Sequence, residues 1–282
     1  MKYPNMTRKP VKRIHAAVSL LIWVLSATLV SACGSLSEDS IIVAGSTSVQ
    51  PFAEVLAEEY MISHPDISID IQGGGSSAGI RAALSGTAEI GMSSRALKDD
   101  ETSLWSVEIA KDGLAIIINP GNPIPNLTLD QIRDIYSAAI TDWSELGGLK
   151  AKIHVITREE GSGTRSAFES LVMDTVWINP RAIVQDSNGA VRQLVADDLN
   201  AIGFISLGLI NENVKALQLG GVAATQENIS NGSYSLSRPF LFVTSGQPTG
   251  QTQLFIDFVL SADGQKLLEA EGLIPSAAGT GR

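Results

Sequence analysis

Three short turns rich in glycine and hydroxyl side chains carry the residues best suited to chemistry in this sequence. They are Gly45–Pro51, Gly73–Gly79 and Glu160–Arg165, and each lies just before a stretch with helical character. Free N–H groups at a helix start, close approach through glycine and hydroxyl donors together favour anion binding. One such turn is ordinary, because Ser and Thr cap many helices. Three of them predict an oxyanion site.

Two arginines flank these turns. Arg158 precedes the third turn and supplies the planar fork of donors that suits an oxyanion. We expect Glu160 to hold its guanidinium in place, the alternative being an exposed ion pair that contributes under about 1 kcal/mol. Arg95 follows Ser94 at the end of a fourth Gly-Met-Ser-Ser stretch. The sequence leaves open whether Arg95 lines the site or faces solvent.

The elements that must position these turns follow from the hydrophobic pattern. Short apolar runs alternate with amphipathic stretches from Ser40 onward, which predicts an α/β protein with mostly parallel strands. Turns from strand to helix lie along the carboxyl ends of the strands, where such sheets bind ligands. We expect strands at Ile41–Ala44, Ile67–Gln72, Leu114–Ile118, Ile153–Thr157, Gly203–Ser206 and Phe240–Thr244. We expect helices at Pro51–Met61, from Ile80, at Leu129–Ser137, at Thr164–Met173, and at Gln251–Leu260 continuing towards Leu268.

Two clusters of breaker residues suggest a division into lobes. Asn119–Pro125 and Asn231–Pro239 are rich in Pro, Gly, Asn and Ser. If the chain crosses between lobes at both, the second lobe is inserted into the first. The predicted domains are then residues 40–117 for lobe 1, 118–239 for lobe 2 and 240–282 for the return to lobe 1.

The first 33 residues have the order of an export signal. A basic stretch is followed by the apolar run Ala16–Val30 and by small residues before Cys33. The run of about fifteen residues is shorter than the roughly twenty needed to span a bilayer, so we expect it to be removed. Val30-Ser-Ala-Cys33 resembles the lipobox of bacterial lipoproteins. This implies a signal peptide at 1–32, a lipidated Cys33 carrying palmitate, a tether at 33–39, and a place on the outer face of the cell membrane or the periplasmic side.

Composition excludes several classes of protein. The chain of 282 residues has 20 Lys and Arg against 30 Asp and Glu, a formal charge of −10, and one cysteine. One cysteine forms neither an internal disulfide nor a cysteine-rich zinc site. The acidic balance argues against a general nucleic-acid binder, which needs a positive field. Any bound anion must therefore be held by local geometry.

Four motifs in order resemble the phosphate-binding proteins of phosphate-specific ABC importers. They are Gly45–Pro51, Gly73–Ile80, Gly91–Arg95 and Arg158–Arg165, with Ala201–Gly208 and Leu236–Phe242 in support. The resemblance implies a two-lobed type II periplasmic-binding-protein fold, each lobe a mostly parallel sheet flanked by helices. It also implies high-affinity binding of inorganic phosphate outside the cytoplasm and delivery to a membrane permease with its ATPase. We expect a monomer that needs no cofactor and catalyses no reaction.

The resemblance also implies the ligand-binding residues. Carried over by position, the phosphate contacts are Thr47, Ser48, Ser76, Ser94, Arg158, Ser162, Gly163 and Thr164, with Ser77, Arg95 and Glu160 as further candidates. Ser94 departs from the family, because many relatives carry an aspartate there that accepts the proton of hydrogen phosphate. Serine does not repel sulfate as a carboxylate does, so sulfate or another tetrahedral oxyanion is the alternative ligand. Glu159 or Glu160 is a candidate for the missing acceptor.

An enzyme is the second alternative. Gly75-Ser-Ser-Ala-Gly79 matches the Gly-x-Ser-x-Gly turn of serine hydrolases, with Ser77 as the nucleophile. The chain beyond the signal has only His64 and His154, and no histidine follows in the late position that such enzymes use. A surface protein that uses the same fold for adhesion or sensing is the remaining possibility.

Overall fold

The computed structural model describes residue 1 and residues 40–276. The predicted lipidation site Cys33 and the tether lie outside the described residues, as does the predicted signal peptide beyond Met1. The helices are α2 (Gln50–Ser63), α3 (Ser76–Ser85), α4 (Leu129–Ser137), α5 (Gly163–Phe168), α6 (Asn188–Asp197), α7 (Gln226–Ser230), α8 (Gly250–Leu260) and α9 (Ala262–Ala270). The strands are β1 (Ser40–Gly45), β2 (Ser68–Gly73), β3 (Ile90–Ser93), β4 (Trp105–Ile118), β5 (Asn126–Leu127), β6 (His154–Arg158), β7 (Ile183–Gln185), β8 (Ala201–Ser206), β9 (Lys215–Ala216), β10 (Gln218–Leu219), β11 (Ser237–Thr244) and β12 (Ile274–Pro275).

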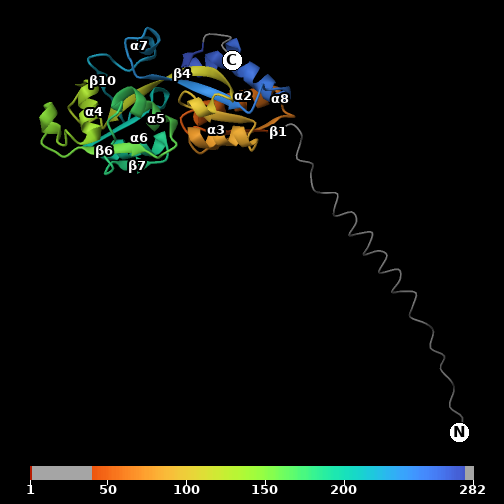
Figure 1. Ribbon diagram of the computed structural model, residues 1–282, viewed down its shortest axis with the longest axis horizontal. Helices are drawn as coiled ribbons and strands as arrows, with labels where there is room; N and C mark the ends of the chain where they lie inside the picture. The colour runs from red at the N-terminus through yellow and green to blue at the C-terminus, as the bar shows by residue number, and fades with distance from the viewer. Residues whose placement is uncertain (2–39, 277–282) are drawn as a thin grey trace. The chain divides into compact units, whose positions relative to one another are not determined.

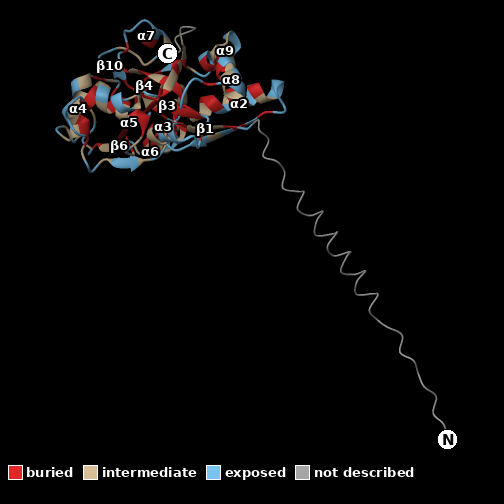
Figure 2. Cartoon of the chain, turned by 45° about the vertical axis from the view of Figure 1, so that its right-hand side comes forward, coloured by how far each residue is buried: buried red, intermediate tan, exposed pale blue. Residues whose placement is uncertain are grey.

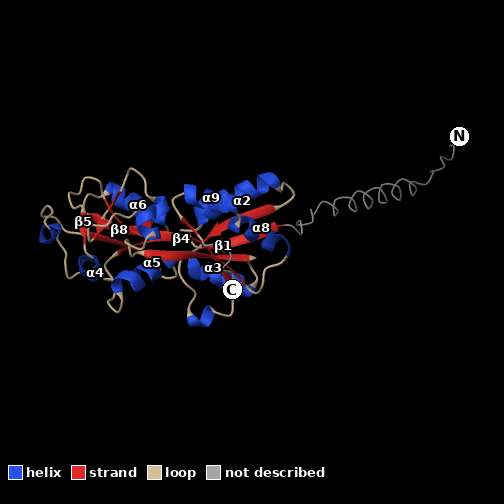
Figure 3. Ribbon diagram, turned by 90° about the horizontal axis from the view of Figure 1, so that it is seen from above, coloured by secondary structure: helices blue, strands red, loops and turns tan. Residues whose placement is uncertain are grey.

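The main sheet has the strand order β2-β1-β3-β11-β4-β8-β6-β7. Strands at either end run parallel, as in the pairs β1–β3, β6–β8 and β6–β7, whereas β11 and β4 pair antiparallel at the centre. Helices cover both faces, with α2, α6 and α9 on one side of the strands and α3, α4 and α5 on the other (Figure 3). The predicted two-lobed α/β fold with flanking helices is confirmed. The sheet is mixed, because β11 pairs antiparallel with β3 and β4, and β4 pairs antiparallel with β8.

Each lobe has its own hydrophobic core. The first core runs from Ile41 to Ala110 and again from Phe240 to Leu273, and the second runs from Leu114 to Leu236. Figure 1 places β4 between these two groups of elements. Figure 2 shows the central strands buried and the outer faces of the helices exposed, and the outer strand β7 is mostly exposed as well. The predicted lobe boundaries at 117/118 and 239/240 stay predictions. The cores favour a first crossing a few residues earlier, between Ala110 and Leu114.

Strand β4 is much longer than the expected strand Leu114–Ile118. Its first part, from Trp105, pairs with β11 in the first core, and its last part pairs with β8 in the second. The charged residues Glu108 and Lys111 interrupt the apolar pattern there, which hides the strand in the sequence. The crossing between lobes therefore lies inside an uninterrupted strand, beside Asp112-Gly113, and not at the breaker cluster Asn119–Pro125.

The expected late helix continuing from Leu260 towards Leu268 is wrong in one respect. The helix is interrupted at Ser261, because α8 ends at Leu260 and α9 begins at Ala262. The Ser261 hydroxyl accepts a hydrogen bond from the Gly264 N–H at 3.3 Å and so caps the new helix. A capping serine inside a continuous helical pattern was the signal for this break.

Within residues 40–276 no helix has the length and apolar character that a membrane crossing requires. The same residues contain no group of three or more His, Cys, Asp or Glu side chains arranged to hold a metal ion.

Candidate functional site

Arg158 is the centre of the polar cluster that joins the two lobes. It lies at the end of β6, is fully buried, and has a bidentate ion pair with the adjacent Glu159, at 2.9 and 3.0 Å. Its Nη2 also donates to the Thr47 hydroxyl at 3.0 Å, so the guanidinium reaches from lobe 2 to the first predicted turn. Its Nη1 is buried and has no hydrogen-bond partner among the described residues. An unpaired donor on a buried cation demands an acceptor.

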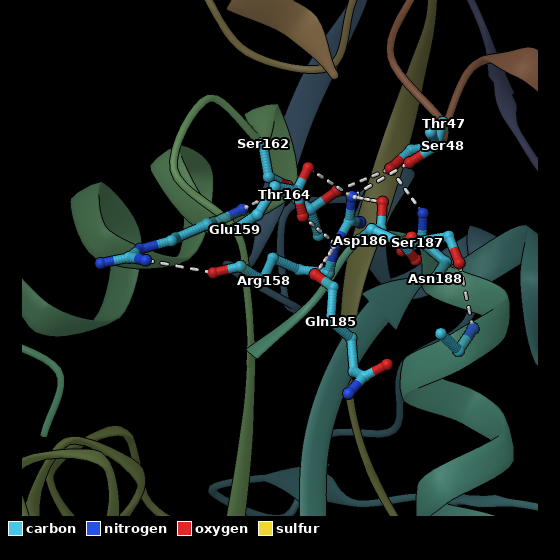
Figure 4. A network of polar contacts seen from close by, with 12 residues as sticks. Thr47, Ser48, Arg158, Glu159, Ser162, Thr164, Gln185, Asp186, Ser187 and Asn188 are labelled. Atoms are coloured by element: carbon cyan, nitrogen blue, oxygen red, sulfur yellow. Dashed lines mark hydrogen bonds and ion pairs between the residues drawn. The ribbon is translucent and has the colours of Figure 1, made fainter. Parts of the chain in front are cut away.

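The first and third turns meet through their hydroxyl groups. The Ser48 and Thr164 hydroxyl oxygens lie 2.6 Å apart, and both residues are buried. Figure 4 shows Thr47 and Ser48 approaching from one side while Arg158 and Thr164 approach from the other. The structure thus brings together residues that are more than a hundred positions apart in the chain.

The third turn opens α5 in the way its composition predicts. Ser162 is the N-cap, and its hydroxyl accepts a hydrogen bond from the Arg165 N–H at 3.3 Å. Gly163 packs directly against lobe 1. A Cβ at this position would collide with the Ser76 and Ser94 hydroxyls. Only glycine permits so close an approach between the lobes here.

The second turn and Ser94 form a chain of hydroxyls in lobe 1. Ser46 donates to the Ser94 hydroxyl at 2.9 Å, and the Ser94 and Ser76 hydroxyls are 3.3 Å apart. The Ser94 N–H donates to the Ser76 hydroxyl at 3.0 Å. All three serines are buried. The three strand-to-helix turns and the Ser94 segment therefore lie together in the structure.

The N-terminus of α3 makes a backbone contact across the lobes. The Ser77 N–H donates to the Gly161 carbonyl at 3.1 Å. Gly75, the N-cap, has φ +87°, a left-handed conformation that favours glycine. A Cβ on Gly75 would meet the Gly161 carbonyl oxygen at 3.2 Å, so this approach also depends on glycine.

Asn188 is a residue of this cluster that the sequence analysis missed. It is buried at the start of α6, and its side-chain amide donates to the Ser48 hydroxyl at 2.8 Å. The signal was a further polar turn, Asp186–Gly189, between a short strand and a helix. Ser187 caps that helix by accepting from the Ala190 N–H at 3.2 Å. The short strand β7 before this turn is mostly exposed, and so the apolar pattern did not mark it.

A second buried ion pair, between Asp112 and Arg238, was missed as well. Arg238 Nε and Nη2 donate to Asp112 Oδ2 at 2.9 and 2.8 Å. Burial raises the pKa of Asp112, against the opposing effect of Arg238. Burial also lowers the pKa of Arg238, and the charge of Arg158 lowers it further. Arg238 belongs to the motif Leu236–Phe242, which the sequence analysis noted only for its resemblance.

The further candidates lie at the border of the cluster. Arg95 is buried rather than facing solvent, and its two terminal nitrogens pair with Glu101 at 2.7 and 2.8 Å, whereas its buried Nε has no hydrogen-bond partner among the described residues. The hydrogen bond from Arg95 lowers the pKa of Glu101. Ser77 accepts a long contact of 3.4 Å from Arg95. Glu160 is exposed, and the expected role of holding the Arg158 guanidinium falls to Glu159.

Neither described histidine contacts Ser77. His154 pairs with Asp198 at 2.6 Å, and His64 stacks on Tyr60 with ring centroids 4.1 Å apart. The cluster is instead made of hydroxyl, amide and guanidinium donors from both lobes. Such a set binds a tetrahedral oxyanion by many charge-assisted hydrogen bonds.

The chain is similar to proteins of known family. Residues 31–263 match the model of the PBP superfamily domain. The phosphate-binding protein PstS of Bacillus subtilis is 31% identical over 242 residues, which are 84% of this chain and 80% of that protein. The PstS protein of Borreliella burgdorferi is 29% identical over 273 residues, covering 91% of this chain and 98% of its own length.

Solved structures similar to this chain include proteins of phosphate ABC transport. A substrate-binding protein from Clostridium perfringens, assigned to phosphate ABC transport and solved with bound phosphate, is 45% identical with a TM-score of 0.82. An ABC-type phosphate transport receptor from Vibrio cholerae is 41% identical with a TM-score of 0.71. Each match covers 84% of this chain and 100% of the other.

Proposed function

Because the chain belongs to the PBP superfamily and to the family of phosphate-binding proteins PstS, we propose that it binds inorganic phosphate for an ABC importer. Phosphate sits between the two lobes, where the hydroxyls of Thr47, Ser48 and Thr164 meet the Arg158 guanidinium. The remaining predicted contacts, Ser76, Ser94, Ser162 and Gly163, complete the set of donors.

A single observation carries this proposal. Arg158 is fully buried, and its Nη1 has no acceptor within the described part of the chain. A buried guanidinium with an unused donor is costly unless a ligand supplies the acceptor. Hydrogen bonds to a charged group contribute roughly 1.5 to 3 kcal/mol each, and several of them outweigh the cost of immobilising the ion. A net acidic chain binds an anion in this way without an attractive overall field.

The chain acts outside the cytoplasm as a carrier and catalyses no reaction. Cys33 carries the lipid that holds it at the membrane surface, and the partners are the permease and ATPase subunits of a phosphate importer. The permease recognises a closed form of the chain in which both lobes contact the ligand. Phosphate shifts the equilibrium towards this form because it binds the closed form more tightly than the open form. The chain works as a monomer without a cofactor.

Calorimetric titration of the purified, phosphate-free chain tests the proposal. Phosphate should bind with a dissociation constant of about micromolar or below, which corresponds to roughly 8 kcal/mol or more. Sulfate is the second titrant, and we expect it to bind more weakly. Absence of phosphate binding contradicts the proposal, and stronger binding of sulfate transfers the function to that anion.

A further inference from the structure

Arg238 and Asp112 lie on the two strands that connect the lobes. Arg238 belongs to β11 and Asp112 to β4, and their Cα atoms are direct cross-strand partners in the antiparallel register. Both side chains are almost fully buried, at 3% and 0% exposure. The ion pair, in which two Arg238 nitrogens donate to one Asp112 oxygen, therefore joins the two crossing strands at the point where one hydrophobic core gives way to the other.

Each partner extends to a different lobe. On one side, Arg238 Nη1 donates to the Ser94 carbonyl at 3.4 Å, which belongs to the lobe 1 serine chain. On the other side, Asp112 Oδ1 accepts from the Ser206 hydroxyl at 2.7 Å at the end of β8 in lobe 2. The ion pair thus contacts Ser94 of lobe 1 directly and also contacts lobe 2 through the Ser206 hydroxyl at the end of β8.

The chain of hydrogen bonds continues from Ser206 back to the site. The Ser206 N–H donates to the Asn188 side-chain oxygen at 3.3 Å, and the Asn188 amide donates to the Ser48 hydroxyl at 2.8 Å. Ser48 in turn lies against Thr164. A continuous polar path therefore runs from Ser94 to Ser48 by way of Arg238 and Asp112.

The buried ion pair on this path has a desolvation cost, so its contribution to stability does not explain why it is present. A buried ion pair is often no more stabilising than apolar residues of the same volume, because both charges lose their hydration. Arg238 also lies close enough to Arg158 for the two like charges to oppose each other. Well-packed apolar side chains on β4 and β11 would avoid both costs. Retaining the pair calls for a role in the site.

We propose that Arg238 and Asp112 are positioning residues of the oxyanion site. The pair fixes Ser94 on one side and, through Ser206 and Asn188, fixes Ser48 on the other. Donors from separate segments are then held at the spacing of one tetrahedral anion. This inference rests on the proposed function.

The test separates positioning from stability. The single variants Asp112→Leu and Arg238→Met each leave one charge buried and unpaired, so both should lower the melting temperature. The double variant Asp112→Leu/Arg238→Met removes both charges and should recover most of that loss. Its dissociation constant for phosphate should nevertheless stay about tenfold or more above that of the unaltered chain. A double variant that binds phosphate as the unaltered chain does would overturn the proposal.

A milder variant serves if the double variant does not fold. Ser206→Ala removes the hydroxyl that links Asp112 to lobe 2, and phosphate should bind about twofold to tenfold more weakly. Ser137→Ala on α4, whose hydroxyl bonds only the Asp134 carbonyl, is the matched control and should bind normally. Equal affinity of Ser206→Ala and Ser137→Ala contradicts the positioning role.

The unaltered chain is titrated with phosphate in the same series. If it binds phosphate and both test variants match it, only the positioning proposal fails. If the unaltered chain does not bind phosphate, the proposed function fails and the positioning role falls with it.

Discussion

The hydroxyl oxygens of Ser48 and Thr164 lie 2.6 Å apart, although 116 positions separate the two residues in the chain. Ser48 precedes a helix of lobe 1 and Thr164 lies in the first turn of a helix of lobe 2. The contact therefore forms only when the two lobes lie close together. An anion held by both hydroxyls favours the arrangement in which the lobes are together, which couples ligand binding to closure.

Arg158→Ala should weaken phosphate binding about tenfold to a hundredfold or more, because it removes charge-assisted hydrogen bonds to the ligand. Arg158→Lys should recover only part of the affinity, since an ammonium does not reproduce the planar fork. Isothermal titration calorimetry measures both. Arg181→Ala, an exposed arginine of lobe 2, is the control and should bind normally. A dissociation constant for Arg158→Ala within about twofold of the control would remove Arg158 from the site.

Gly163→Ala should weaken phosphate binding because the added Cβ collides with the Ser76 and Ser94 hydroxyls and keeps the lobes from closing. The decrease in radius of gyration that phosphate causes, measured by small-angle scattering, should be smaller in this variant. Gly189→Ala is the matched control, since nothing lies within 4 Å of a Cβ there. If both alanine variants close to the same extent, the lobes do not need the close contact at Gly163.

Ser94→Asp should sharpen the discrimination between phosphate and sulfate. A carboxylate accepts the proton of hydrogen phosphate but repels sulfate, which has no proton to donate at neutral pH. The ratio of the two dissociation constants should rise by about tenfold or more in favour of phosphate. Ser94→Asn, which has similar size without the charge, separates the effect of charge from that of volume. An unchanged ratio would mean that selectivity is set elsewhere in the cluster.

Glu101→Gln should change how stability depends on pH. The hydrogen bond from Arg95 lowers the pKa of Glu101 below 4.5, so the folded protein binds fewer protons at this site than the unfolded chain. The ion pair therefore stabilises the fold above the pKa of the unfolded state, and this stabilisation is lost as pH falls through the lower folded pKa.

The difference in unfolding free energy between the unaltered chain and Glu101→Gln should then shrink between about pH 6 and about pH 3. Urea unfolding at several pH values measures it. Lys266→Gln, which breaks an exposed ion pair with Asp263, should leave the pH profile nearly unchanged. A constant difference for Glu101→Gln across this range contradicts a stabilising role for the Arg95 pair.

Local chemistry was enough to predict the turns. Gly75 and Gly163 stand where backbones approach closely, Ser162 caps α5, and the order of the four motifs indicated the family. Strand and helix patterns also predicted the α/β fold. These features depend on residues near each other in the chain, which is the range over which propensity and capping act.

Only the tertiary structure decided which polar groups meet. Glu159 rather than Glu160 holds Arg158, because the end of β6 directs one carboxylate to the guanidinium and the next to solvent. Asp112 and Arg238 meet through strand pairing between β4 and β11, where charged residues had hidden the pattern, and Asn188 joins the cluster through a side-chain hydrogen bond from α6 to Ser48. Such contacts depend on sheet register and on the packing of two cores, and residues 126 to 140 positions apart carry no local sign of them.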